Sequence, residues 1–95
     1  SMRIEQQKVW DKKWRIIIFD IPEKKGRRAR DAMRFKLQNI GFYQLQKSVW
    51  VFPYPCEKEV QLICEVFEIN PFVNIVIAEK VYNDDDLRKY FKLSK

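Results

Sequence analysis

The chain has 95 residues and no histidine, so it can form one domain with a hydrophobic core, and catalysis or zinc binding by imidazole is excluded. Hydrophobic residues make up 46% of the chain and aromatic residues 15%, which excludes disorder as its main state. Lys and Arg total 19 against 13 Asp and Glu, and the resulting net charge of +6 favours a polyanionic partner such as nucleic acid.

The first predicted strand lies within Lys13–Glu23 and follows a polar segment, residues 1–12, which we interpret as a lead-in or a truncated linker. Both faces of this strand are largely apolar, as is typical of a central strand that is covered on both sides. Asp20 is the exception, because it places a carboxylate at the exit of the strand. This residue is either a cap for the following turn or a functional group held at the edge of the sheet.

A helix is predicted from about Gly26 to Ile40, and Gly41 ends it as a C-cap. Its apolar residues recur at helical spacing and form a buried stripe: Ala29, Met33, Leu37 and Ile40. The opposite side carries a row of cations: Arg27, Arg28, Arg30, Arg34 and Lys36. Cations at a helix N-terminus oppose the helix dipole, so a phosphate partner would explain them. The alternative is a solvated face that Asp31 partly neutralises.

Two strands follow, Phe42–Gln46 and Ser48–Phe52, joined by a tight turn at Lys47 or by a bulge in one bent ribbon. The second of them is apolar on both faces and therefore also central, and prolines close it. A second helix is predicted from about Cys56 to Ile69, and a fourth strand over Phe72–Ala78.

Cys56 and Cys64 lie too far apart along this second helix to form a disulfide, so we interpret them as core residues. Two free thiols suit a reducing cytoplasm. The sequence contains no signal peptide and no apolar run long enough for a membrane span, so we expect a cytoplasmic protein without a membrane partner.

The order strand, helix, strand, strand, helix, strand predicts an α+β domain with the ferredoxin-like βαββαβ fold. Its four-stranded antiparallel sheet has the order 4-1-3-2, with two helices on one face. The inner strands are then the first and the third, whose patterns are those of buried strands. We expect the other face of the sheet to pack against a second copy in a homodimer, because it is too apolar to face water.

We place this domain at residues 13–79 and a C-terminal extension with a short helix at residues 80–95. Three acids, Asp84–Asp86, directly precede the short helix. They resemble a metal cluster, but we expect them to cap and charge the helix N-terminus.

Several short motifs, over about Trp10–Ala78, resemble the Cas2 family of CRISPR adaptation proteins, and within it the Cas2-like middle domain of PaaX-type transcription repressors. The Cas2-like marks are Phe19-Asp20, the basic first helix and the segment Gln46-Lys47-Ser48-Val49-Trp50. The PaaX-like marks are Trp10-Asp11, Trp14-Arg15, Phe19-Asp20-Ile21-Pro22-Glu23, Arg30-Asp31, Gly41-Phe42, and Leu45-Gln46 leading into Val49-Trp50-Val51.

The resemblance implies a dimer in which Asp20 of both subunits would hold a divalent cation such as Mg²⁺ for phosphodiester hydrolysis. Asp20 is therefore the implied catalytic and metal-binding residue. The implied contacts to the phosphates of DNA, or of RNA, fall on Arg27, Arg28, Arg30, Arg34 and Ser48.

Three functions follow. The first is a CRISPR-associated dimer that acts as a DNA scaffold in spacer acquisition, bridges Cas1 subunits and carries a Mg²⁺-dependent endonuclease activity. The second is the dimerisation domain of a PaaX-type transcription repressor. The third is a ferredoxin-like interaction module with neither role. We favour the first, because the chain is a single domain of Cas2 size without a DNA-reading module of its own.

Overall fold

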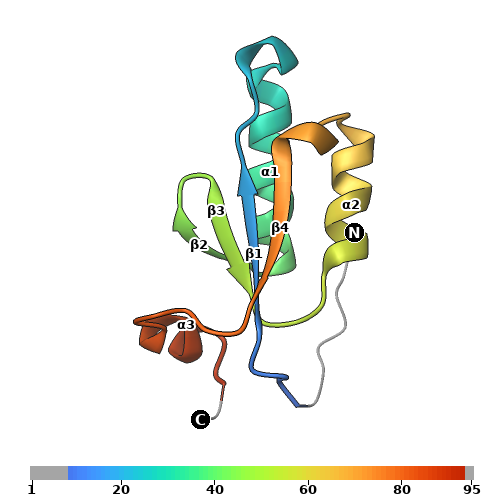
Figure 1. Cartoon of the computed structure of the whole chain (residues 1–95). Coiled ribbons are helices and arrows are strands. Elements are labelled where there is room, and N and C mark those ends of the chain that lie inside the picture. Colours follow the sequence, from blue (N-terminus) through green and yellow to red (C-terminus); the bar gives the residue numbers. More distant parts are fainter. Residues whose placement is uncertain (1–8, 94–95) are drawn as a thin grey trace.

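The structure, a computed structural model, describes residues 9–93 (Figure 1). The elements in this range are β1 (Trp14–Phe19), η1 (Glu23–Lys25), α1 (Arg27–Ile40), β2 (Tyr43–Gln46), β3 (Val49–Phe52), α2 (Glu57–Val66), η2 (Asn70–Phe72), β4 (Val73–Ala78) and α3 (Asp85–Tyr90). The strands form one antiparallel sheet in the order β2-β3-β1-β4. This order confirms the predicted ferredoxin-like α+β fold and the central position of β1 and β3.

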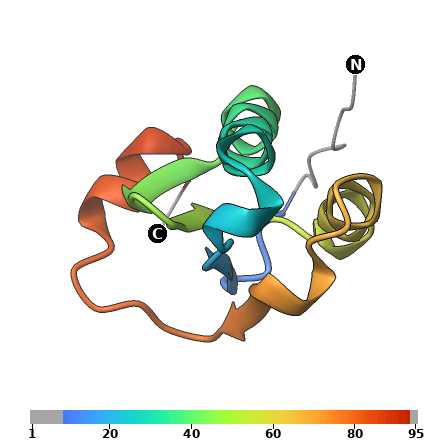
Figure 2. The same ribbon diagram turned by 90° about the horizontal axis from the view of Figure 1, so that it is seen from above.

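The main core lies between one face of the sheet and the two long helices, α1 and α2 (Figure 2). Alternate residues of the strands point to this face, because successive side chains of a strand point to opposite sides. The buried residues that meet there include Ile17, Phe19, Trp50 and Phe52 from the sheet, Met33 and Leu37 from α1, and Val60 and Ile63 from α2. The apolar stripe predicted for the first helix is therefore the face of α1 that packs on the sheet.

The helix ends agree with the sequence pattern at α1 and differ from it at α2. Gly41 has φ of 114°, and its N–H donates to the carbonyls of Gln38 and Leu37, which confirms the predicted C-cap. The prediction that the second helix continues to Ile69 is wrong, because α2 ends at Val66. Glu68 has φ of 54°, and this left-handed residue turns the chain so that Ile69 is buried outside the helix.

The C-terminal extension covers part of the other sheet face. Leu87 of α3 is buried in a second apolar cluster with Trp14 and Val51. The ring centroid of Phe91 lies 6.2 Å from that of Trp14. Tyr90 packs edge-on against Tyr43 of β2, with 5.1 Å between ring centroids. The extension is therefore folded against the sheet.

The remainder of this face stays open. We call it the open sheet patch, and it consists of Ile16, Ile18, Val49 and Val76. The strand register joins these residues, because Ile16 lies opposite Val76 and Ile18 lies opposite Val49. Ile18 and Val76 are each 40% exposed. The expectation that β1 is covered on both faces thus holds within the chain at Trp14, and at Ile18 it stays a prediction that depends on a second copy.

The predicted role of Asp84–Asp86, to cap and charge the N-terminus of α3, is only partly found in the structure. Asp84 is the N-cap residue, yet its side chain makes no capping hydrogen bond. Its Oδ2 atom instead accepts a hydrogen bond of 3.0 Å from Nε of Arg88, one turn further along. Asp85 and Asp86 lie in the first turn of α3, where their charges interact favourably with the helix dipole as expected.

No helix in the described part of the chain has the length and hydropathy needed to cross a membrane.

An ion pair between the buried Arg15 and the exposed Asp11 fixes the entry to β1. Arg15 is only 5% exposed, and its guanidinium donates to both carboxylate oxygens of Asp11, at 2.9 and 2.6 Å. The same group donates to the carbonyl of Pro53 at 2.8 Å, which ties the start of β1 to the end of β3. The hydrogen bond from Arg15 lowers the pKa of Asp11. The pair therefore contributes to stability while Asp11 is ionised.

We expect Asp11→Ala to lower the free energy of unfolding at neutral pH by about 1–3 kcal/mol, because it leaves a buried guanidinium without its main acceptor. The pKa of Asp11 is lowered in the folded state, so its contribution is present above the ordinary aspartate pKa and is lost as the pH falls through the lowered value. Urea denaturation at neutral and acidic pH measures both effects. The matched control is Glu79→Ala, an exposed acid with no ion pair among residues 9–93. An equal loss of stability in both variants would contradict this role of Asp11.

Candidate functional site

Asp20 lies where β1 leaves the sheet, next to the start of β3. Its backbone N–H donates to the carbonyl of Phe72 at 2.9 Å, and the N–H of Phe19 donates to the carbonyl of Ser48 at 3.1 Å. The side chain of Asp20 is exposed, while Ile21 behind it is buried and anchors the chain to the core. The structure thus brings Asp20 and Ser48, which are distant in sequence, to the same end of the sheet.

The turn after Asp20 is formed by backbone hydrogen bonds. The N–H of Lys25 donates to the carbonyl of Pro22 at 3.0 Å, and the N–H of Gly26 donates to the backbone carbonyl of Glu23 at 2.7 Å. Gly26 has φ of 94°, a conformation that glycine adopts easily, and it directs the chain into α1. Within residues 9–93 the Asp20 carboxylate accepts no hydrogen bond. The turn therefore forms without Asp20 as a cap, and its carboxylate faces solvent.

A metal site at Asp20 would need ligands from elsewhere. Among residues 9–93 no group of three or more Asp, Glu or Cys side chains is placed to hold a metal ion. A single exposed carboxylate suits a hard cation such as Mg²⁺ in ligand type but supplies too few oxygen atoms. Metal binding and catalysis by Asp20 remain predictions that require a second subunit.

The first turn of α1 starts at the same end of the molecule (Figure 1). Arg27 and Arg28 are exposed there, and in the described part of the chain neither forms an ion pair. Arg30 and Arg34 are half-buried further along the helix. Asp31 pairs with Arg34 alone, at 3.6 Å, so the expected neutralisation does not reach Arg27 or Arg28.

This end of the molecule therefore presents two unpaired arginines, a serine and a carboxylate. The N-terminal cations gain nothing from the helix dipole, which leaves them available for phosphate groups. Arg34, the last of the predicted phosphate-binding residues, lies away from this end along α1.

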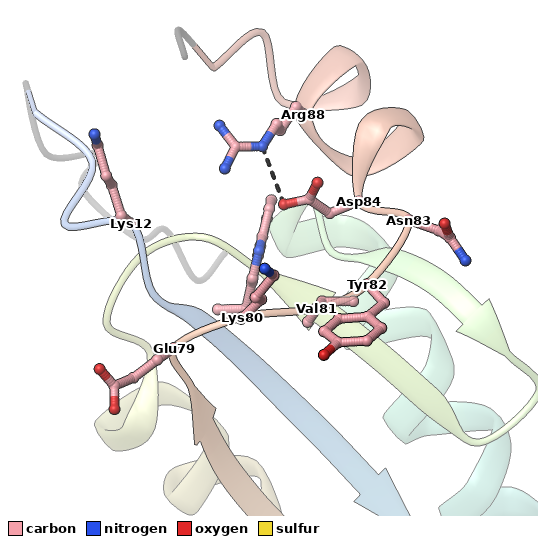
Figure 3. A pocket seen from close by; sticks show the side chains of 9 residues that line it. Lys12, Glu79, Lys80, Val81, Tyr82, Asn83, Asp84 and Arg88 are labelled. Carbon is pink, nitrogen blue, oxygen red and sulfur yellow. Dashed lines mark hydrogen bonds and ion pairs between the residues drawn. The ribbon is translucent and has the colours of Figure 1, made fainter.

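A pocket of about 470 Å³ lies between the entry to β1 and the C-terminal extension (Figure 3). The sequence did not predict it. Lys12 and Lys80 line it together with the buried ring of Trp14. Figure 3 shows Arg88 directed toward Asp84, its ion-pair partner. The Arg88 guanidinium also lies 4.9 Å from the centre of the Trp10 ring, so this cation serves to hold the extension in place. Nothing in the local sequence pattern marks this pocket, because its two walls are far apart in the chain.

The open sheet patch is the other prominent surface. All its side chains are aliphatic, and the residues beside them in the register, Gln46 and Asn74, are uncharged. An uncharged apolar patch of this kind on a chain of net charge +6 is typical of a protein interface.

Comparison with known protein families found a match to the PaaX protein central Cas2-like domain over residues 7–90. Searches of curated proteins and of solved structures found no match. The matched range contains the whole sheet and both long helices, and it continues to the end of α3. It agrees with the resemblance carried by the Phe19-Asp20 and Val49-Trp50-Val51 motifs. The chain therefore belongs to the family of PaaX central Cas2-like domains.

Proposed function

We propose that this domain is the homodimerisation module of a PaaX-type transcription repressor. The observation that carries the proposal is the open sheet patch, where Ile18 of the central strand β1 and Val76 of the edge strand β4 are each 40% exposed. Two copies related by a twofold axis would bury this patch against itself, since the same surface is then used by both subunits. The family of the domain and this surface both support a role in joining two regulator chains.

The distribution of charge supports a second copy as the occupant of the patch. Two chains of net charge +6 repel each other unless their cations are kept apart. The basic row of α1 lies on the helix-covered face of the sheet, opposite the open sheet patch (Figure 2). Packing sheet against sheet therefore directs both basic helices away from the interface.

We expect the native chain to sediment as a dimer at micromolar concentration and Ile18→Lys to sediment as a monomer, because the dimer would then bury unpaired ammonium groups. Analytical ultracentrifugation measures the two states, and circular dichroism checks that the variant is folded. Leu62→Lys is the control, since Leu62 is 51% exposed on α2, away from the patch. A native chain that is monomeric under these conditions would overturn the proposal.

The basic row of α1 would then lie against DNA phosphates. Arg27 and Arg28 are exposed cations at the helix start, and Arg30 follows one turn later. Contacts of this kind are electrostatic and independent of base sequence, and they weaken as salt rises. They would support the binding of a regulator dimer to its site.

We expect the native chain to bind duplex DNA in a salt-dependent manner and the combined change of Arg27, Arg28 and Arg30 to Glu to weaken this binding strongly. Loss of three phosphate contacts should reduce the slope of log affinity against log salt by about 3. The control changes Lys80, Lys89 and Lys92 to Glu, which alters the net charge equally at exposed positions outside α1. Equal losses in both variants would show that only the net charge matters.

A second candidate function is a Cas2-type nucleic-acid scaffold that works with Cas1 and hydrolyses phosphodiesters. The observation that favours it is the position of Asp20 and Ser48 at the end of the molecule where Arg27 also lies. Asp20 from each subunit would supply oxygen ligands to Mg²⁺, and the ion would activate a water molecule. Ser48 and Arg27 would hold the phosphate.

The two candidate functions predict different results in a nucleic-acid cleavage assay. Under the dimerisation proposal we expect no Mg²⁺-dependent cleavage of labelled duplex DNA or single-stranded RNA by the native chain. Cleavage that EDTA abolishes and that is lost in Asp20→Ala would instead establish the Cas2-type activity. Glu23→Ala is the control for this variant, because Glu23 is an exposed acid in the next turn.

A further inference from the structure

The two edges of the sheet differ in their protection against pairing with other strands. β2 is short, its register is interrupted between Gln44 and Gln46, and Tyr90 packs on Tyr43. β4 pairs with β1 in an unbroken register over Val73–Ala78, and these residues include no charge and no proline. Charges, prolines and bulges are the features that keep natural edge strands from adding further strands. β4 has none of them.

The outer edge of β4 carries apolar side chains on both of its faces. Val76 on the open face is 40% exposed, and Ile77 on the helix-covered face is 44% exposed. Within residues 9–93 no strand pairs with this outer edge. The backbone N–H and C=O groups along it are therefore available to an added strand.

The helix beside this edge is acidic. Figure 1 shows α2 beside β4, whereas α1 lies behind β1. α2 contains three glutamates and a single cation, Lys58, and Glu68 follows the helix, so residues 57–68 have a net charge of −3 in a chain of net charge +6. Leu62 and Val66 of α2 are 51% and 66% exposed. The β4 side thus combines negative charge with exposed apolar side chains.

We propose that the outer edge of β4, together with α2, is a docking surface for an extended segment of another protein that is both apolar and basic. The segment adds to the sheet as a further strand: backbone hydrogen bonds hold it, and its cations face the glutamates of α2. A second copy fits less well, because pairing β4 with β4 around a twofold axis brings two acidic α2 helices together. The negative charge also disfavours nucleic acid.

The test uses a short fluorescent peptide of alternating valine and lysine, with binding to the native chain followed by fluorescence anisotropy. We expect Ile77→Lys to weaken binding by at least about tenfold, because a charge on the edge opposes strand addition. The combined change of Glu65 and Glu68 to Lys should also weaken it. Leu45→Lys is the matched control on the other edge strand, where Leu45 is 47% exposed, and it should bind as the native chain does.

Two further measurements separate strand addition from simple charge attraction. A peptide of the same sequence in which every backbone nitrogen is methylated has the same charge but no backbone N–H to donate, so we expect no binding. Amide hydrogen exchange on the native chain should slow in β4 when the valine–lysine peptide binds, and this result does not depend on the folding of any variant. Equal binding of both peptides, or unchanged exchange in β4, would overturn the proposal.

The docking surface shares Val76 with the open sheet patch, but separate variants distinguish it from the dimer interface. Ile18→Lys should bind the valine–lysine peptide as the native chain does, whatever its state of association. If the Ile77→Lys variant instead has a lower sedimentation coefficient than the native chain, β4 pairs with a second copy, and the proposal of a basic partner segment is wrong.

Discussion

The position of β1 between β3 and β4 is the constraint on which the rest of the structure depends. A strand with hydrogen-bonded neighbours on both sides has two broad faces, and both faces of β1 are apolar. Helices α1 and α2 cover one of them. The other is covered by α3 only around Trp14, and Ile18 is left exposed. The exposed remainder is the physical reason for proposing a dimer.

Charge divides the surface into parts that suit different partners. α1 carries the basic row, α2 carries most of the glutamates of the helix layer, and the open sheet patch carries no charge. Because these parts lie on different sides of one small sheet, the three partners proposed above would not compete for the same face. This arrangement suits a module that assembles other components better than it suits an enzyme with an enclosed active site.

Asp20 belongs to the Phe19-Asp20 motif, but the residues around it do not complete a metal site. The motif places a carboxylate at the end of β1, and the fold adds Ser48 and the start of α1 near it. The same carboxylate is exposed and has no companion acids in residues 9–93 with which to hold a metal. Metal binding by Asp20 would therefore require oxygen ligands from a second subunit.

Much of the fold follows from the sequence alone, because alternation in the strands and helical spacing in α1 are local signals. They predicted the sheet order, the buried stripe of α1 and the Gly41 cap. Local patterns do not record where α2 ends, since the left-handed conformation of Glu68 is not signalled by its residue type. Nor do they record contacts across the chain: Arg15 with the Pro53 carbonyl, α3 on Trp14, and Ser48 beside Phe19. These contacts join residues far apart in sequence, so only the packed tertiary structure decides them.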